Sequence, residues 1–193
     1  VTTFYDMDSH EFFGFYEVKS SGCVAAFMHD HPNPGAVQEI SIDMSPAFIK
    51  GARQCFPQAA ITFDKWHVIK LLYKHLGDLK GKAHRFNTVI ELLMGKISIF
   101  YQSRDKEEGA AQLRFIADFA YEQMGKNPIT KTIDKYWEGI CQYWTSRLNN
   151  GVLEGINSKI QVIKRVARGF KYKQNFMKMI RFVFTKTQFQ VIS

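Results

Sequence analysis

The apolar residues in the first third of the chain fall into short runs separated by turn-forming residues. Runs rich in β-branched and aromatic side chains predict strands, and the turn at Asp8-Ser9-His10 predicts that the first two form a hairpin. Ser45 followed by Pro46 predicts the start of a helix. The pattern predicts strands over 1–7, 11–18, 37–42 and 59–63, and helices over 23–29 and about 46–55. Strands that alternate with helices indicate a mixed α/β sheet.

Beyond residue 63 the apolar residues recur at helical spacing, and no further strand is predicted. Asp64 can cap the first of these helices, which carries the apolar side chains Trp66, Val68, Ile69, Leu71 and Leu72. Further helices are predicted over about 83–101, 106–125, 129–146, 152–167 and 173–190. This long helical run must either cover the sheet or form a layer of its own.

The helix predicted over 152–167 has two different faces. One face can be buried and consists of Ile156, Ile160, Ile163 and Ala167. The other face consists of Glu154, Asn157, Ser158, Gln161, Lys164, Arg165 and, just beyond, Arg168. One carboxylate ahead of a basic stripe suits a metal ligand placed where a phosphate backbone comes close, although the pattern is not unique to catalysis.

The net charge of +8 is concentrated in the last quarter of the chain. Residues 159–186 hold nine Lys or Arg and no acid, and Lys171-Tyr172-Lys173 follows Gly169 in what reads as an exposed loop. This distribution indicates a polyanionic partner, while a solvated basic face is the simpler alternative. No apolar run is as long as a membrane span, and no signal peptide is visible.

The widely spaced cysteines, Cys23, Cys55 and Cys141, indicate neither a disulfide framework nor a zinc site, and a reducing cytoplasm is the simplest location. The tripeptide His29-Asp30-His31 is followed by two prolines and a glycine and reads as a surface loop. There is no Walker-type loop and no nucleophile elbow, so covalent nucleophilic catalysis has little support.

Two acids follow predicted strands directly. Asp43 is either a metal ligand at the carboxyl end of its strand or a turn acid before Ser45. Asp64 reads as a helix cap, and His67, one turn further on, as an orienting or packing side chain. Together, Asp64 and His67 could also be a metal pair or could surround Asp43.

Two segments, ISIDMSPAFIKGARQCFPQAAITFDKWHVIKLL and RLNNGVLEGINSKIQVIKRVARGFKYKQNF, resemble the DDE transposase domain of the ISL3 family of bacterial insertion sequences. Each motif alone is weak, but the ordered set is specific. The resemblance implies a ribonuclease H-like mixed sheet with a large helical insertion, whose first strand is missing from this chain. Residues 1–69 would be the strand-rich core, 70–146 the insertion, and 147–193 the C-terminal helices with the basic tail.

The same resemblance implies a site that binds two Mg²⁺ or Mn²⁺ ions. Asp43 corresponds to the second catalytic Asp and Glu154 to the final Glu, with Asp64 as the alternative to Asp43 and His67 beside the site. The family's first Asp would precede Val1, so this chain alone is expected to be inactive.

The implied activity is DNA strand cleavage and strand transfer in transposition, by a homo-oligomer on transposon ends and target DNA in the bacterial cytoplasm, without membrane contact. The residues expected to bind DNA are Asn157, Lys159, Lys164, Arg165, Arg168, Lys171 and Lys173. A catalytically inactive DNA-binding remnant and a ribonuclease H-like nuclease outside transposition are the alternatives.

Overall fold

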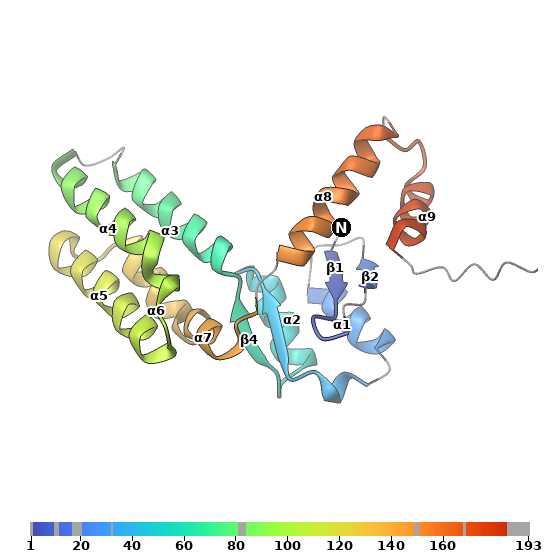
Figure 1. Ribbon diagram of the computed structural model, residues 1–193, viewed down its shortest axis with the longest axis horizontal. Coiled ribbons are helices and arrows are strands. Elements are labelled where there is room, and N and C mark those ends of the chain that lie inside the picture. The colour runs from blue at the N-terminus through green and yellow to red at the C-terminus, as the bar shows by residue number, and fades with distance from the viewer. Residues whose placement is uncertain are drawn as a thin grey trace, which may run out of the picture. The chain divides into compact units, whose positions relative to one another are not determined.

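The computed structural model describes residues 2–9, 12–16, 21–31, 33–80, 84–148, 151–167 and 169–184. The chain divides into two compact units (Figure 1). Unit 1 consists of Val1–Lys19 and Asn150–Ser193, and unit 2 consists of Ser20–Asn149. In the part of the chain that is described, no helix is both long and apolar enough to cross a membrane.

Unit 1 contains the predicted hairpin and two helices. Strands β1 (Thr2–Tyr5) and β2 (Phe12–Tyr16) pair antiparallel, as the turn between them predicts. Helices α8 (Gly151–Val166) and α9 (Lys173–Phe184) pack through Ile156, Ile160 and Ile180, all of which are buried. Tyr5 of the hairpin joins this cluster, so both ends of the chain contribute to one small core.

The buried face of α8 is shorter than its periodicity predicts. Ile156 and Ile160 are buried and Ile163 is half-buried, but Ala167 is exposed. The expectation for Ala167 is wrong because α8 ends at Val166, so Ala167 already belongs to the turn that follows the helix.

The α/β part of unit 2 begins with α1 (Ser21–Asp30) and continues through a short 3-10 turn, η1 (Pro34–Ala36). Strand β3 (Glu39–Ile42), helix α2 (Pro46–Cys55) and strand β4 (Ala60–Phe63) follow. The two strands pair in parallel, with Ile42 opposite Phe63. Helices α1 and α2 approach closely, since a Cβ added at Gly51 would lie 2.9 Å from Val24 Cβ.

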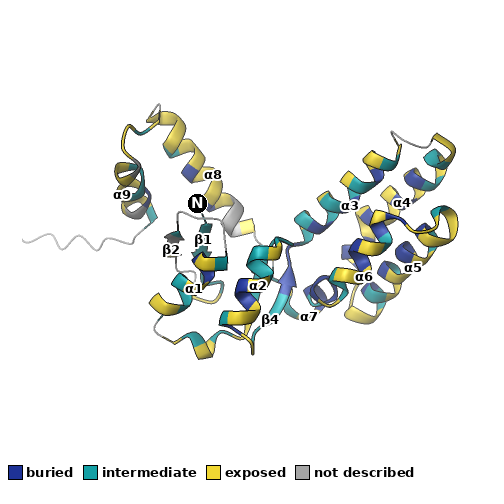
Figure 2. Ribbon diagram, turned by 180° about the vertical axis from the view of Figure 1, so that it is seen from behind, coloured by how far each residue is buried: buried dark blue, intermediate teal, exposed yellow. Residues whose placement is uncertain are grey.

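The helical part of unit 2 begins directly after β4. It comprises α3 (Lys65–Lys80), η2 (His84–Phe86), α4 (Asn87–Ile99), η3 (Phe100–Gln102), α5 (Lys106–Met124), α6 (Pro128–Cys141) and α7 (Tyr143–Ser146). The helices α3 to α6 turn their buried residues toward one another (Figure 2). Leu72, Leu93, Leu113 and Ile133 are fully buried there, and Phe63 of β4 belongs to the same core.

The predicted helix breaks have local causes in the structure. Asp105 caps α5 by accepting a hydrogen bond from Glu108 N at 2.8 Å. Asn127 caps α6 by accepting from Ile129 N and Thr130 N, both at 3.0 Å. The helix predicted over 129–146 is divided in two by a turn at Gln142.

The fold is therefore mixed α/β and mostly helical, but the single mixed sheet is not evident. Within the described ranges the strands form two separate two-stranded sheets, β1 with β2 and β3 with β4. One lies in unit 1 and the other in unit 2. The alternation of apolar and polar residues predicts that a segment is a strand, but it does not specify which strands pair with one another. The sequence pattern could therefore not show that these short strands form two separate pairs.

Candidate functional site

The parallel pairing of β3 and β4 places two acidic residues at one edge of the sheet. Asp43 directly follows Ile42, and Asp64 directly follows its partner Phe63. The ladder continues one step further, because Asp64 N donates to Ile42 O at 3.0 Å. Neighbouring strands lie about 4.8 Å apart, so the structure brings together the two acids that the sequence offers as alternatives.

Asp43 is half-buried in the turn between β3 and α2. Its Oδ1 accepts a hydrogen bond from Ser45 N at 2.9 Å. Ser45 occupies the N-cap position before Pro46, as predicted, but its side chain makes no capping hydrogen bond. The backbone contact of Asp43 therefore orders the turn, and the predicted turn role of this acid is present.

Asp64 is almost fully buried, with 2% of its surface exposed. Its Oδ1 accepts from His67 N at 3.0 Å, which is the predicted cap of α3, and lies 2.8 Å from His67 Nδ1. Burial, and after it the negative charge of Asp64, raises the pKa of the Tyr101 hydroxyl well above its ordinary value. Asp64 is thus held in place by the first turn of α3, and it orients the imidazole of His67.

The helices that follow β4 in sequence also support this edge of the sheet. Thr62 Oγ1 and Ser146 Oγ lie 3.0 Å apart, and the rings of Phe63 and Tyr136 meet edge to face with centroids 5.3 Å apart. A Cβ added at Gly139 would lie only 2.4 Å from Phe63 Cε2. The backbone of α6 therefore touches the residue that precedes Asp64.

Trp66 is a feature of this edge that helical periodicity does not identify. The pattern groups it with the apolar side chains of α3, but the structure leaves 51% of it exposed. Lys70 Nζ lies 4.6 Å from the centroid of its ring, and the His67 ring meets it edge to face at 5.2 Å. The available signal is its position in the first helical turn, between Lys65 and His67.

The basic residues predicted to bind DNA lie mainly on α8 and just after it. Asn157, Lys159, Lys164 and Arg165 are exposed on α8, and Lys171 is exposed beyond it. Gln161, Lys164, Arg165 and Gly169 surround an open hollow of about 320 Å³. Arg168 lies outside the described residues, as does the side chain of Lys173. The described polar side chains of this face of α8 are therefore exposed to solvent, and their role in DNA binding stays a prediction.

Glu154 lies in the first turns of α8, and its side chain lies outside the described residues. Asp43 belongs to unit 2 and Glu154 to unit 1, so the two residues of the predicted metal site lie in different units. Among the described residues no group of three or more His, Cys, Asp or Glu could hold a metal ion.

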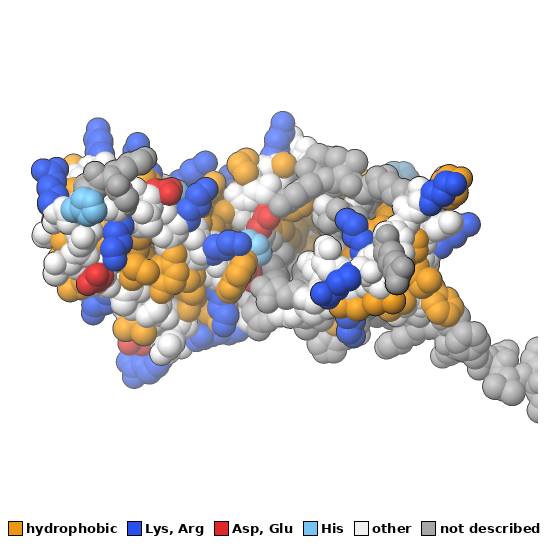
Figure 3. Space-filling model, turned by 90° about the horizontal axis from the view of Figure 1, so that it is seen from above, with side chains coloured by type: hydrophobic (Ala, Val, Ile, Leu, Met, Phe, Trp, Pro, Cys, Tyr) orange, Lys and Arg blue, Asp and Glu red, His pale blue; other side chains and the backbone are white. Residues whose placement is uncertain are grey.

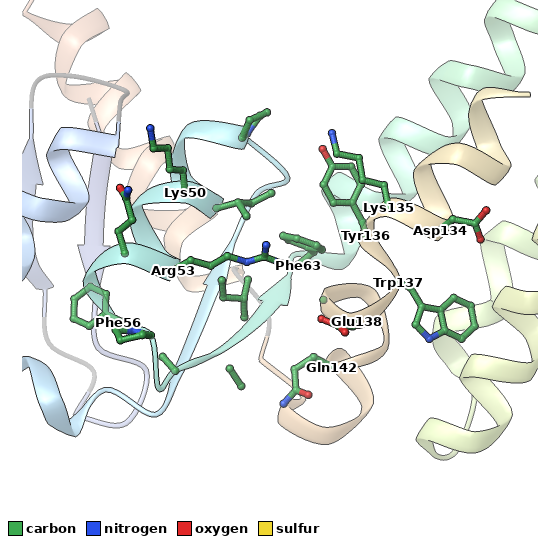
Figure 4. A pocket seen from close by; sticks show the side chains of 18 of the residues that line it. Lys50, Arg53, Phe56, Phe63, Asp134, Lys135, Tyr136, Trp137, Glu138 and Gln142 are labelled. Atoms are coloured by element: carbon green, nitrogen blue, oxygen red, sulfur yellow. The ribbon is translucent and has the colours of Figure 1, made fainter.

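A hollow of unit 2 lies between α2, β4 and α6 and has a volume of about 1380 Å³ (Figure 4). Lys50 and Arg53 extend from α2, and Tyr136 and Glu138 line the opposite wall on α6. Arg114 at the same wall is paired with Asp134 at 3.3 Å. The hollow is thus lined by apolar side chains and by charges of both signs. Figure 3 shows that Lys and Arg side chains are also spread over the face of the molecule seen there, so basic residues are not confined to this hollow.

The chain resembles known transposases over most of its length. Residues 1–115 and 98–180 match the ISL3 family model, which is described as a transposase. The chain is 25% identical over 215 residues to the transposase for insertion sequence element IS1001 of Bordetella parapertussis. That alignment covers 86% of this chain and 52% of the relative, so the chain spans about half the length of the curated relative. No solved structure matches the chain.

The ordered strand ends and the basic helix agree with this match. Because the family model extends over residues 1 to 180, the protein belongs to the ISL3 family of DDE transposases.

Proposed function

We propose that the chain is a transposase catalytic domain that takes part in metal-dependent DNA strand cleavage and strand transfer of an insertion sequence. The observation that carries the proposal is the parallel pairing of β3 and β4, which puts Asp43 and Asp64 at one sheet edge inside a chain of this family. The carboxyl ends of parallel strands are where α/β proteins usually bind their ligands.

The proposed fold is ribonuclease H-like, with residues 1–69 and 147–193 as the core and 70–146 as a helical insertion. The hairpin, the parallel pair and the following helices occur in the order that this arrangement requires. Contact between α6 and Phe63 supports an insertion that packs on the core instead of standing apart from it.

Asp43 and Glu154 are proposed to hold Mg²⁺ or Mn²⁺. Carboxylate oxygens are the donors that such hard cations prefer, so the donor chemistry of these two residues fits the ions. Asp43 is preferred to Asp64 because Asp64 is almost fully buried and its Oδ1 is engaged by both His67 N and His67 Nδ1. When bound, such ions activate a water or hydroxyl nucleophile and neutralise charge on the leaving oxygen.

The exposed basic face of α8 is proposed to hold the DNA backbone. Cationic side chains attract phosphates regardless of base sequence and release counterions on binding. Lys164 and Arg165 are exposed on the face of α8 to which position 154 belongs by helical spacing, so phosphate contacts along this face would bring DNA near Glu154. Lys159 adds an exposed cation on another side of the same helix. We propose that Arg168, Lys171 and Lys173 extend this DNA-binding surface. We also propose that more than one copy of the protein assembles on paired transposon ends.

The experiment compares Asp43→Asn, Asp64→Asn and Glu154→Gln in the complete protein, with transposon-end DNA and Mg²⁺ or Mn²⁺. We expect Asp43→Asn and Glu154→Gln to abolish cleavage and leave DNA binding within about twofold. Cleavage that survives either substitution would refute the ligand assignment. Loss of cleavage in Asp64→Asn, with Asp43→Asn active, would transfer the metal role to Asp64.

A further inference from the structure

The indole of Trp66 lies at the same strand edge as the two acids, but it is not part of the apolar core. It is two residues beyond Asp64, in the first turn of α3. Val68 and Leu72 of the same helix are fully buried, whereas 51% of Trp66 is exposed. An exposed indole offers a flat apolar face that a ligand can cover, and this one lies beside the candidate site.

A cationic side chain and an imidazole lie against the Trp66 ring. Lys70, one helical turn on, places Nζ 4.6 Å from the ring centroid, and His67 approaches the ring at 5.2 Å. Lys65 lies on the other side of Trp66 in sequence, with Nζ 5.7 Å from the Tyr143 ring. An apolar protein segment laid on this indole would have to desolvate nearby ammonium groups, which is unfavourable without an anionic partner.

A nucleotide offers the complement of this arrangement, because a flat base accompanies a negatively charged phosphate. Bases stack on aromatic side chains without sequence preference, and nearby cations neutralise the phosphates. We propose that Trp66 is a stacking platform for an unpaired nucleobase of the DNA strand that passes the Asp43 and Asp64 edge. The inference rests on the proposed function, since it takes DNA as the ligand.

Tryptophan fluorescence can test the stacking directly in the whole 193-residue chain. The other two tryptophans are less exposed, since Trp144 is 5% exposed and Trp137 is half-buried. We expect single-stranded oligothymidylate to quench the fluorescence of the unmodified chain and to leave Trp66→Phe unquenched. Trp66→Phe should still bind within a few-fold, because a phenyl ring also stacks.

Trp66→Ala should weaken single-strand binding by about tenfold, as expected for one stacked base. Tyr121→Ala is the matched control, since Tyr121 is 52% exposed on α5, and it should bind like the unmodified chain. An oligonucleotide of abasic sites should bind the unmodified chain and Trp66→Ala equally weakly. Quenching that persists in Trp66→Phe, or full affinity in Trp66→Ala, would overturn the proposal.

The same titrations separate this inference from the proposed function. A chain that binds neither duplex nor single-stranded DNA contradicts both. A chain that binds duplex transposon ends, and whose complete protein cleaves them, but that shows no change in Trp66 fluorescence contradicts the stacking platform alone. Quenching by oligothymidylate in a chain whose complete protein cleaves no DNA supports the platform and contradicts the catalytic proposal.

Discussion

The contact between α6 and β4 leads to a quantitative prediction for Gly139→Ala. The added Cβ would lie 2.4 Å from Phe63 Cε2 and 2.5 Å from Cδ2, about 1 Å short of the 3.4 Å at which ordinary contact begins. Phe63 is 4% exposed and its ring meets Tyr136, so the ring has little room to move. Overpacking of this kind costs about 1–3 kcal/mol, and helix propensity returns up to about 1 kcal/mol.

Gly95→Ala is the matched control. Gly95 lies inside α4, and a Cβ added there meets nothing within 4 Å, so this variant should gain up to about 1 kcal/mol from propensity alone. The difference in unfolding free energy between the two variants then isolates the packing cost, which we expect to be about 1–3 kcal/mol. Urea denaturation followed by circular dichroism measures it.

If Gly139→Ala proves as stable as Gly95→Ala, the close approach of α6 to Phe63 is wrong. The consequence would extend to the candidate site, because Phe63 immediately precedes Asp64. The interpretation that the helices after β4 support the strand end before Asp64 would then be wrong.

Two further predictions concern unit 2. Asn127→Ala removes the cap of α6 and the hydrogen bonds from Asn127 Nδ2 to Ala120 O and Gly125 O. Urea denaturation should therefore show that the free energy of unfolding falls by about 2–4 kcal/mol, and a fall below about 1 kcal/mol would contradict the cap. Desolvation lowers the pKa of His75, against the opposing charge of Asp78, so the unfolded chain takes up this proton first as the pH falls through about 6.5. The stability that neutral His75 contributes is therefore present above that pH and lost below it. His75→Gln should make the urea midpoint fall less between pH 7.5 and 5.5 than it does in the unmodified chain, and an equal fall in both would refute the role of His75.

Features that depend on near neighbours in sequence could be predicted from the sequence. Pro46 begins α2, as predicted, because caps and prolines act on the turn they adjoin. The basic face of α8 follows from helical periodicity alone, as does the burial of Ile156 and Ile160. The capping role of Asp64 is equally local, since its partner His67 is three residues away.

Tertiary structure decided the features that depend on residues far apart in the chain. The pairing of Ile42 with Phe63 puts Asp43 beside Asp64, and no local signal specifies which strands pair or in what register. Phe63 meets Gly139 on α6, and Thr62 meets Ser146, through close approaches that only the packed helices create. Periodicity groups Trp66 with the core of α3, but the side chains available to cover it are set by long-range packing, and they leave it exposed. The reason is general: backbone propensity and capping act within one or two turns, whereas burial and strand register depend on which distant segments meet.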